Sequence, residues 1–366
     1  MAKIEWVRRI YEDGWHNAFT DFQFFKGRYY ICFRNGLSHV SSEGKAVVIA
    51  SDDLVDWHRA GVPVNTTGDD RDPHLVATED RLFVYAGNVT RPDPVQHGDE
   101  GPRLIRSVCS FSEDGASWTE PQQVYRDGYW LWGVGRADDR ADDLLYGLAY
   151  GNEPSEWNLK PTELHLLQST DGLVWELVSV VTRNGSEATF RITDAGTMRV
   201  AIRGGDENRF TIAVAKPPYT DWRLQNLGES IPAPRLVVAG GREYVIGRQH
   251  VREPGGPSGQ GGPSGSGGPG DKNAAGDTDA AGGSGRPDDA ADPGRIVERR
   301  TSIWRVEEDG VVHVLDLPSG GDTSYVGAVQ HEDGALLLSY YSQHEVETGE
   351  KHFLYPANIY LAKVRL

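Results

Sequence analysis

Short apolar runs, each bounded by Gly, Asp, Asn or Pro, recur along most of the chain. They are rich in β-branched and aromatic residues, which favour strands, and no segment keeps the 3.6-residue period of an amphipathic helix over ten or more residues. We therefore predict an all-β protein. The predicted strands cover residues 28–33, 45–50, 81–86, 104–111, 144–150, 164–168, 197–202, 210–215, 236–238, 243–247, 301–306, 335–341 and 358–364.

A seven-residue phrase that ends in tryptophan is repeated between these runs. It reads SEDGASW at 112–118, STDGLVW at 169–175 and, more loosely, SDDLVDW at 51–57, and a shorter copy ends at Trp222. Asp-Gly is a common turn pair, Ser and Asp side chains can accept hydrogen bonds from nearby backbone N–H groups, and the tryptophan ring can cover the turn. We interpret the phrase as a structural lock on a turn.

The spacing of the phrase predicts the architecture. The final tryptophans of its copies are separated by 61, 57 and 47 residues, and repeats of roughly 40–50 residues are typical of propeller blades. The part of the chain outside one low-complexity segment is long enough for about six such blades. We predict a six-bladed β-propeller of four-stranded antiparallel blades, in which the last strand pairs with a strand near the N-terminus.

The low-complexity segment covers residues 253–296 and consists mainly of Gly, Pro, Ser, Ala and Asp. Because it has too few apolar side chains to form a core, we predict a disordered insertion. Predicted strands flank it on both sides, and the stretch that follows is short for an independent propeller fragment. We therefore expect residues 1–366 to form a single propeller domain that carries this insertion.

Charge and composition exclude several classes of partner. The net charge of −17 argues against binding to nucleic acid, although a local cluster of arginines can still bind a small anion. The two cysteines, Cys32 and Cys109, lack metal-binding spacing, and we predict neither a metal site nor another cofactor. No apolar run is long enough to span a membrane and no signal peptide is visible, so we expect a cytoplasmic protein without a membrane partner.

Several motifs resemble the sialidase (neuraminidase) superfamily in its small bacterial form. They are the repeated tryptophan phrase, known in that family as the Asp box or BNR repeat, and the segments HNAFTDF (16–22), KGRYY (26–30), TSYVG (323–327) and SYYSQHE (339–345). The resemblance covers nearly the whole chain apart from the insertion. It implies a six-bladed propeller and an exo-acting glycoside hydrolase.

The resemblance also implies a set of site residues. Sialidases use three arginines to bind the substrate carboxylate, an aspartate as acid/base, and a tyrosine–glutamate pair as nucleophile and base. Residues of these types occur here in the family's order: Arg34, Asp72, Glu187, Arg203, Arg248 and Tyr325. We therefore expect Asp72, Glu187 and Tyr325 to be catalytic and the three arginines to bind substrate.

Neighbouring residues leave some of these assignments open. Asp69 and Asp70 are alternatives to Asp72 as the acid, and Arg235 and Arg242 are alternatives to Arg248. Further candidates for substrate binding or for the lining of the site are Asp21, Arg235, Tyr340, Tyr341, His16, His344, Trp130 and Trp132.

The implied substrate is terminal sialic acid or a related 2-keto sugar acid, cleaved with retention. Such a sugar carries its carboxylate beside the anomeric carbon, where a carboxylate nucleophile would be repelled and a neutral phenol would not; sialidases are known exceptions to the two-carboxylate scheme. Because a phenol is a poor nucleophile at neutral pH, a neighbouring glutamate must accept its proton. The identity of the sugar, hydrolysis versus glycosyl transfer, and the oligomeric state stay open.

Two other functions fit the same residues. One is a five-bladed furanosidase-like glycoside hydrolase that uses the carboxylates of Asp21, Asp72 and Glu187 without a tyrosine nucleophile. The other is a propeller that binds carbohydrate without catalysis. Replacement of Tyr325 by Phe separates these possibilities, because only the sialidase-like mechanism requires its hydroxyl group.

Overall fold

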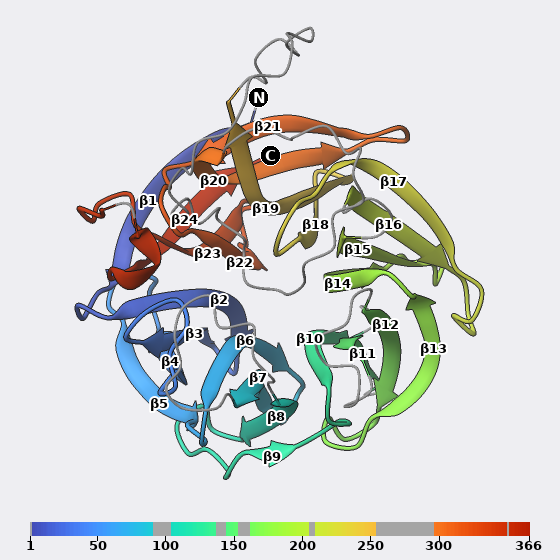
Figure 1. The fold of residues 1–366 in the computed structure, drawn as a ribbon, viewed down its shortest axis with the longest axis horizontal. Helices are drawn as coiled ribbons and strands as arrows, with labels where there is room; N and C mark the ends of the chain where they lie inside the picture. Colours follow the sequence, from blue (N-terminus) through green and yellow to red (C-terminus); the bar gives the residue numbers. More distant parts are fainter. Residues whose placement is uncertain are drawn as a thin grey trace, which may run out of the picture.

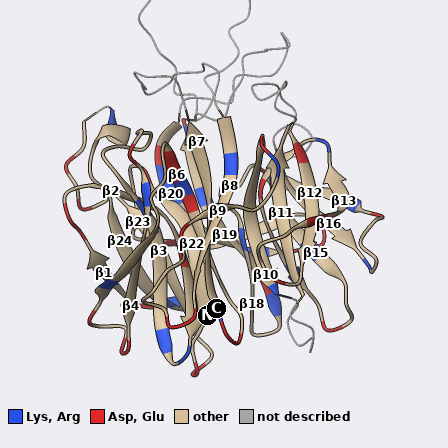
Figure 2. Cartoon of the chain, turned by 90° about the horizontal axis from the view of Figure 1, so that it is seen from below, with Lys and Arg blue, Asp and Glu red and all other residues tan. Residues whose placement is uncertain are grey.

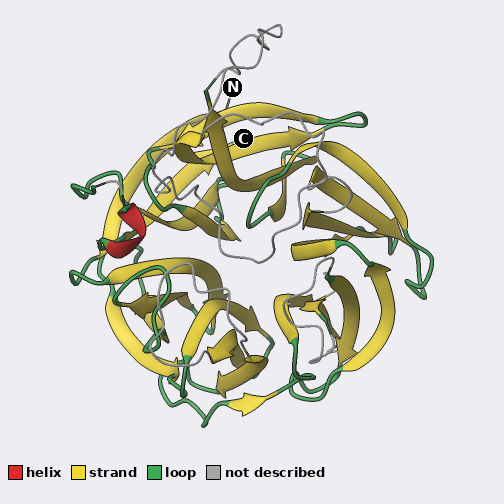
Figure 3. Cartoon of the chain, in the orientation of Figure 1, coloured by secondary structure: helices red, strands yellow, loops and turns green. Residues whose placement is uncertain are grey.

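The structure is a computed structural model that describes residues 2–90, 104–136, 144–152, 162–204, 209–253, 296–349 and 351–366. These residues form six four-stranded antiparallel sheets, arranged as blades around a central axis (Figure 1). Within the described residues, the one helical element is the 3-10 turn His352–Leu354 (Figure 3), and no helix there is long and apolar enough to cross a membrane. The predicted six-bladed β-propeller is confirmed.

Each blade runs from an inner strand beside the axis to an outer strand at the rim. The first two blades are β2 (His16–Phe25), β3 (Arg28–Gly36), β4 (Lys45–Ser51), β5 (His58–Val64), and β6 (Asp69–Ala77), β7 (Leu82–Thr90), β8 (Leu104–Ser112), β9 (Gln122–Gln123). The next two are β10 (Tyr129–Arg136), β11 (Leu145–Gly151), β12 (Glu163–Ser169), β13 (Glu176–Thr182), and β14 (Gly185–Ile192), β15 (Met198–Gly204), β16 (Arg209–Ala215), β17 (Arg223–Glu229). The last two are β18 (Arg235–Ala239), β19 (Arg242–Arg252), β20 (Ile296–Val306), β21 (Val311–Leu317), and β22 (Ser324–Gln330), β23 (Leu336–Ser342), β24 (Asn358–Arg365), β1 (Lys3–Tyr11).

The N-terminal strand closes the ring. β1 is the outer strand of the sixth blade and pairs antiparallel with β24 from Lys3↔Arg365 to Tyr11↔Ile359. One blade is therefore built from both ends of the chain, as the sequence predicted. Closure removes the exposed edges that an open array of sheets would leave.

The predicted disordered insertion, residues 253–296, lies almost entirely outside the described residues. Its two ends are described, because β19 ends at Arg252 and β20 begins at Ile296, and these residues are paired. The insertion therefore interrupts a β-hairpin inside the fifth blade. β19 runs antiparallel to the inner strand β18, so β19 ends at the end of the ring where the inner strands begin. The candidate site described below lies at this same end.

Apolar side chains between neighbouring blades form the core. Val48 of the first blade and Val84 of the second belong to one buried cluster, and Ile246 of the fifth blade packs in another with Leu338 of the sixth. Second and third strands are covered on both faces by such contacts. This explains why they carry the near-continuous apolar runs that the sequence shows.

The repeated tryptophan phrase forms the turn between the third and fourth strands of a blade. In the third blade the Ser169 hydroxyl accepts from the Gly172 amide (2.9 Å), and Asp171 Oδ1 accepts from the amides of Leu173 and Val174 (2.8 Å each). The copies that begin at 51 and 112 make the same contacts. The interpretation as a turn lock is confirmed.

Candidate active site

Five of the six inner strands carry an irregularity near their start, where pairing with the second strand shifts in register. The shifts enclose residues 18–21, 71–74, 131–133, 185–188 and 324–327. Each of these segments contains a residue that faces the others across the axis: Phe19, Asp72, Trp132, Glu187 and Tyr325. A β-bulge changes the direction of a side chain from the regular alternation along the strand. The bulges therefore let these five side chains point toward the axis.

Backbone strain accompanies these bulges. Phe19, Asp72 and Tyr325 have φ values of 60°, 45° and 53°, in the left-handed region that residues other than glycine rarely adopt. Charged positions lie next to one another on β6 and on β20 toward one end of the ring (Figure 2). We identify this region as the candidate active site because strained residues, charged residues and the side chains of five inner strands meet there.

The phenol of Tyr325 and the carboxylate of Glu187 form the centre of the site. The Tyr325 hydroxyl donates to Glu187 Oε1 at 2.7 Å, and the same oxygen accepts from Arg203 Nη1 at 2.9 Å. The second oxygen of Glu187 accepts from the Ala233 amide at 2.7 Å. Burial, reinforced by the negative charges of Glu187 and Asp72, raises the pKa of Tyr325 well above its ordinary value. The resting pair is therefore a neutral phenol bonded to a hydrogen-bond acceptor.

Asp72 lies near this pair and is buried with fewer hydrogen bonds than Glu187. Its Oδ2 accepts from Trp132 Nε1 at 3.3 Å, and its Oδ1 is buried without a hydrogen-bond partner among the described residues. Burial raises the pKa of Asp72 to about 7; Arg71 opposes this rise and the charge of Glu187 adds to it. A carboxyl group with this pKa keeps its proton into the neutral range.

The two other aspartates on β6, Asp69 and Asp70, make structural contacts. Asp69 forms ion pairs with Arg34 (2.7 Å) and Arg71 (3.2 Å). Asp70 accepts from the amide and hydroxyl of Thr66 at 2.6 and 2.7 Å, which ties down the preceding turn. The geometry therefore favours Asp72 over Asp69 and Asp70 as the acid.

Arg34, which the sequence predicts to bind substrate, is held by contacts within the protein. Its side chain is fully buried, and its three nitrogens bond to Asp69 Oδ1 (2.7 Å), the Ser38 carbonyl (2.8 Å) and Ser41 Oγ (2.9 Å). Each of the three guanidinium nitrogens therefore makes a contact inside the protein. These contacts support a structural role for Arg34, and the expectation that it binds substrate stays a prediction.

The structure places Arg71 close enough to Asp72 and Tyr325 for its charge to act on both. Its guanidinium carbon lies 4.9 Å from the centre of the Phe19 ring, and Nη1 donates to the His39 carbonyl at 2.8 Å. Sequence reasoning missed Arg71, although a charged residue directly before Asp72 was a usable signal.

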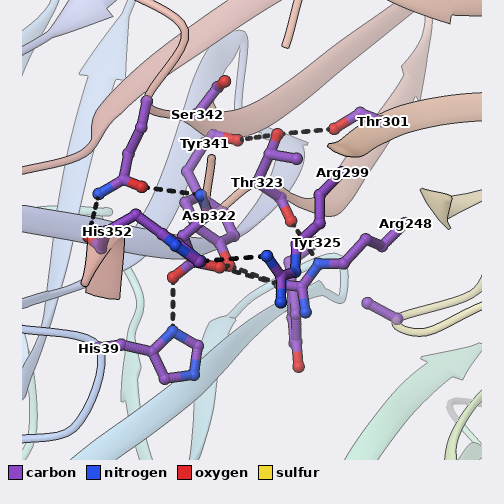
Figure 4. Close-up of polar contacts among 12 residues, drawn as sticks. His39, Arg248, Arg299, Thr301, Asp322, Thr323, Tyr325, Tyr341, Ser342 and His352 are labelled. Atoms are coloured by element: carbon purple, nitrogen blue, oxygen red, sulfur yellow. Dashed lines mark hydrogen bonds and ion pairs between the residues drawn. The ribbon is translucent and has the colours of Figure 1, made fainter. Parts of the chain in front are cut away.

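The other two expected arginines do lie beside Tyr325. Arg203 reaches Glu187, as described, and the guanidinium carbon of Arg248 lies 5.6 Å from the centre of the Tyr325 ring. Arg299, which the sequence did not single out, lies beside Arg248 (Figure 4). Arg299 is on the same face of the β19–β20 pair, because its strand neighbour Thr301 is opposite Arg248.

Asp322, also unpredicted, organises this side of the site. Its Oδ2 lies 2.5 Å from His39 Nδ1 (Figure 4) and 3.0 Å from His16 Nε2. Its Oδ1 accepts from Tyr341 (2.7 Å) and from Arg248 Nη2 (3.2 Å). Burial alone would raise the pKa of Asp322, but His39, His16 and Arg248 together lower it well below its ordinary value. Asp322 is therefore an anionic hub that holds Arg248 in place.

This hub has the spacing of a metal site, because donor atoms of His16, His39 and Asp322 lie within 4.8 Å of one another. However, four contacts already occupy both oxygens of the carboxylate. A cation bound there would compete with the guanidinium of Arg248. We interpret the group as a hydrogen-bonded network.

Three further predicted residues support the site rather than open onto it. Tyr341 is fully buried and accepts from Arg248 Nη2 at 2.8 Å. Arg235 and Asp21 form an ion pair with each other, and Asp21 also accepts from the Leu75 amide at 3.1 Å. Tyr341, Asp21 and Arg235 thus make contacts within the protein, and their expected contacts with substrate stay predictions. The five-bladed alternative, which needed the Asp21 carboxylate, is wrong because the ring has six blades.

Solved structures with this fold are found among sialidases. Trypanosoma rangeli sialidase in complex with the inhibitor DANA superposes with a TM-score of 0.62 at 11% identity, over 96% of this chain and 55% of that chain. Phage phi92 endosialidase gives 0.58 at 11% identity, over 98% of this chain and 69% of that chain. A protein of unknown function from Dyadobacter fermentans gives 0.72 at 16% identity, over 100% and 99%.

At the level of sequence, neither a protein-family model nor a curated protein matches the chain. The chain spans about half the length of the trypanosomal sialidase. The fold is that of a sialidase-like β-propeller, which confirms the resemblance seen in the sequence at the level of fold.

Proposed function

We propose that this protein is an exo-acting, retaining glycoside hydrolase that removes a terminal sialic acid or a related 2-keto sugar acid. The observation that carries the proposal is the 2.7 Å hydrogen bond from the Tyr325 hydroxyl to Glu187, with Asp72 held nearby as a buried carboxylic acid. A nucleophile bonded to its base, together with a separate proton donor, is the set that a retaining mechanism requires.

In the first step, the Tyr325 oxygen bonds to the anomeric carbon as the bond from that carbon to the leaving oxygen breaks. Glu187 takes the phenolic proton, and Asp72 gives its proton to the leaving oxygen. In the second step, Asp72 takes a proton from water, whose oxygen bonds to the anomeric carbon. The phenolate leaves and recovers its proton from Glu187, so both steps balance and two inversions give retention.

The arginines around Tyr325 favour an anionic substrate. Guanidinium groups match a carboxylate in geometry as well as charge, and Arg71, Arg203 and Arg248 all act on the Tyr325 phenol. A carboxylate bound by Arg248 and its neighbour Arg299 would place the anomeric carbon of a 2-keto sugar acid close to that phenol. A neutral sugar has no anionic group that could pair with these arginines.

The test measures hydrolysis of 4-methylumbelliferyl glycosides of N-acetylneuraminic acid and other 2-keto sugar acids, with the glucoside and galactoside as neutral controls. We expect turnover of an acidic glycoside alone, and its near-complete loss in Tyr325→Phe and in Glu187→Gln. The matched control is Tyr340→Phe: Tyr340 is buried next to Tyr341 in the chain, and among the described residues its hydroxyl bonds only to the Pro318 carbonyl. Turnover by Tyr325→Phe at the wild-type rate would refute the mechanism.

The non-catalytic alternative makes a different prediction in the same assay. A carbohydrate-binding propeller would bind the sugar acid with an affinity that Tyr325→Phe leaves intact, and it would cleave none of the glycosides. Analysis of the products with and without an added acceptor sugar separates hydrolysis from glycosyl transfer.

A further inference from the structure

His39 lies in the loop between β3 and β4, and contacts hold both its backbone and its ring. Its backbone amide donates to the Phe353 carbonyl (2.9 Å), and its carbonyl accepts from Arg71 Nη1 (2.8 Å). Its ring meets the rings of Phe19 and Phe353 edge to face, with centres 5.3 and 5.5 Å apart. Such packing gives the imidazole one orientation.

Asp322 determines which nitrogen of this ring carries the proton. Its Oδ2 lies 2.5 Å from His39 Nδ1, and an ionised carboxylate can only accept, so Nδ1 must donate. Burial lowers the pKa of His39 to about 4 despite the attraction of Asp322, so the ring is neutral at neutral pH. A neutral imidazole has one N–H, which leaves Nε2 with a free lone pair.

Nε2 of His39 has no hydrogen-bond partner among the described residues, and the side chain keeps 15% of its surface exposed. In Figure 4 the ring bonds Asp322 through one nitrogen and turns the other toward the side where Tyr325 lies. The cationic groups on this side, Arg71, Arg248 and Arg299, can only donate. His39 therefore supplies a neutral acceptor beside these donors.

We propose that His39, oriented by Asp322, accepts a hydrogen bond from one hydroxyl or amide N–H of the bound sugar acid and so determines which sugars are cleaved. This inference rests on the proposed function. Arginines recognise the carboxylate that all such sugars share, whereas an oriented acceptor distinguishes sugars that carry a donor at one ring or side-chain position from sugars that lack it. A site built around such a bond discriminates strongly against the analogue without the donor.

The test pairs a change in the protein with a change in the substrate. The substrates are the 4-methylumbelliferyl glycoside of N-acetylneuraminic acid and its 4-deoxy, 9-deoxy and 5-deacetamido analogues, each lacking one donor. We expect the wild type to lose about 10-fold or more in kcat/KM on one analogue and little on the others. His39→Phe should lose a similar factor on the parent substrate and nothing further on that analogue.

Two variants separate this effect from misfolding. His39→Gln keeps an acceptor and should recover part of the discrimination, and His313→Phe, an exposed histidine on the outer strand β21, should change nothing. Thermal unfolding of each variant checks the fold. Discrimination that persists unchanged in His39→Phe, or a wild type indifferent to all three analogues, would overturn the inference and leave the proposed function standing.

A measurement without turnover tests the same claim. ¹⁵N NMR of histidine-labelled protein at pH 7 should show His39 as the neutral Nδ1–H tautomer, with the Nε2 signal shifting when N-acetylneuraminic acid is added. A cationic ring or the Nε2–H tautomer would contradict the inference. If the wild type neither cleaves the four glycosides nor binds the free sugar, the proposed function and this inference both fail.

Discussion

Asp72 and Glu187 are both carboxyl groups close to the Tyr325 phenol, but they differ in the hydrogen bonds that they accept. Glu187 accepts three hydrogen bonds from a phenol, a guanidinium and an amide, and each of them stabilises its charge. Asp72 has one long contact with Trp132 and one oxygen without a partner. Because their environments differ in this way, we expect Glu187 to act as the base and Asp72 as the acid.

The acid role of Asp72 predicts an alkaline limit to activity. Asp72 must be protonated to donate, and its pKa is about 7, so kcat/KM should fall as the pH rises through about 7. Asp72→Asn should lower kcat/KM by ~10²–10⁴-fold and abolish this alkaline limb. The loss should be smallest for glycosides with the most acidic leaving groups, which need least protonation. An unchanged pH profile in Asp72→Asn would remove Asp72 from this role.

The buried ion pair of Arg34 predicts an effect on stability. Arg34→Met leaves Asp69 buried with only Arg71 as a cationic partner, so we expect a loss of about 3 kcal/mol in the free energy of unfolding by urea. The exposed pair of Arg28 with Asp52 is the control, and Arg28→Met should cost less than ~1 kcal/mol. A stable Arg34→Met protein with a raised KM would instead assign Arg34 to substrate binding.

Residue chemistry was predictable only in part. The order of residue types in the sequence indicated Tyr325, Glu187 and Asp72, and the structure brings these three together. Arg34, Tyr341 and Asp21 have equally suitable chemistry, but their donors and acceptors are used by partners such as Asp69, Asp322 and Arg235. Sequence does not show such pairings, because the partners are far apart in the chain.

At the scale of elements, the strands that the sequence revealed are mostly second and third strands of blades. Their side chains are buried on both faces, as in β3 and β4, so the apolar runs are continuous. Inner strands other than β18 were missed, and polar site residues interrupt several of them; β6 begins with four charged residues, 69–72. Outer strands such as β13 were missed because many of their side chains are exposed.

The turn lock predicts a local effect on stability. Ser169→Ala removes the buried hydroxyl that accepts from the Gly172 amide, and leaving that amide without a partner should cost about 1–3 kcal/mol of unfolding free energy. Ser42→Ala, at an exposed serine, is the control. Because this turn lies at the outer part of the third blade, kcat/KM should not change. A Ser169→Ala protein as stable as the wild type would show that the phrase does not lock the turn.

At the scale of the whole molecule, stability depends on closure of the ring. Removal of residues 2–11 deletes β1, which exposes the edge of β24 and uncovers the apolar residues on which Ile4 and Val7 pack. We expect the cooperative thermal transition to be lost, or its midpoint to fall by more than about 10 °C. Circular dichroism and calorimetry measure this. A truncated protein that unfolds cooperatively within a few degrees of the wild type would show that the other five blades do not need the closing strand.

The most direct test of the central claim is to identify the atom that bonds to the sugar. A 2,3-difluoro analogue of sialic acid, whose fluorines slow both steps, should leave a covalent adduct that peptide mass spectrometry assigns to Tyr325, and Tyr325→Phe should remain unlabelled. An adduct on Asp72 or Glu187, or cleavage of acidic glycosides with no adduct on Tyr325, would contradict the account.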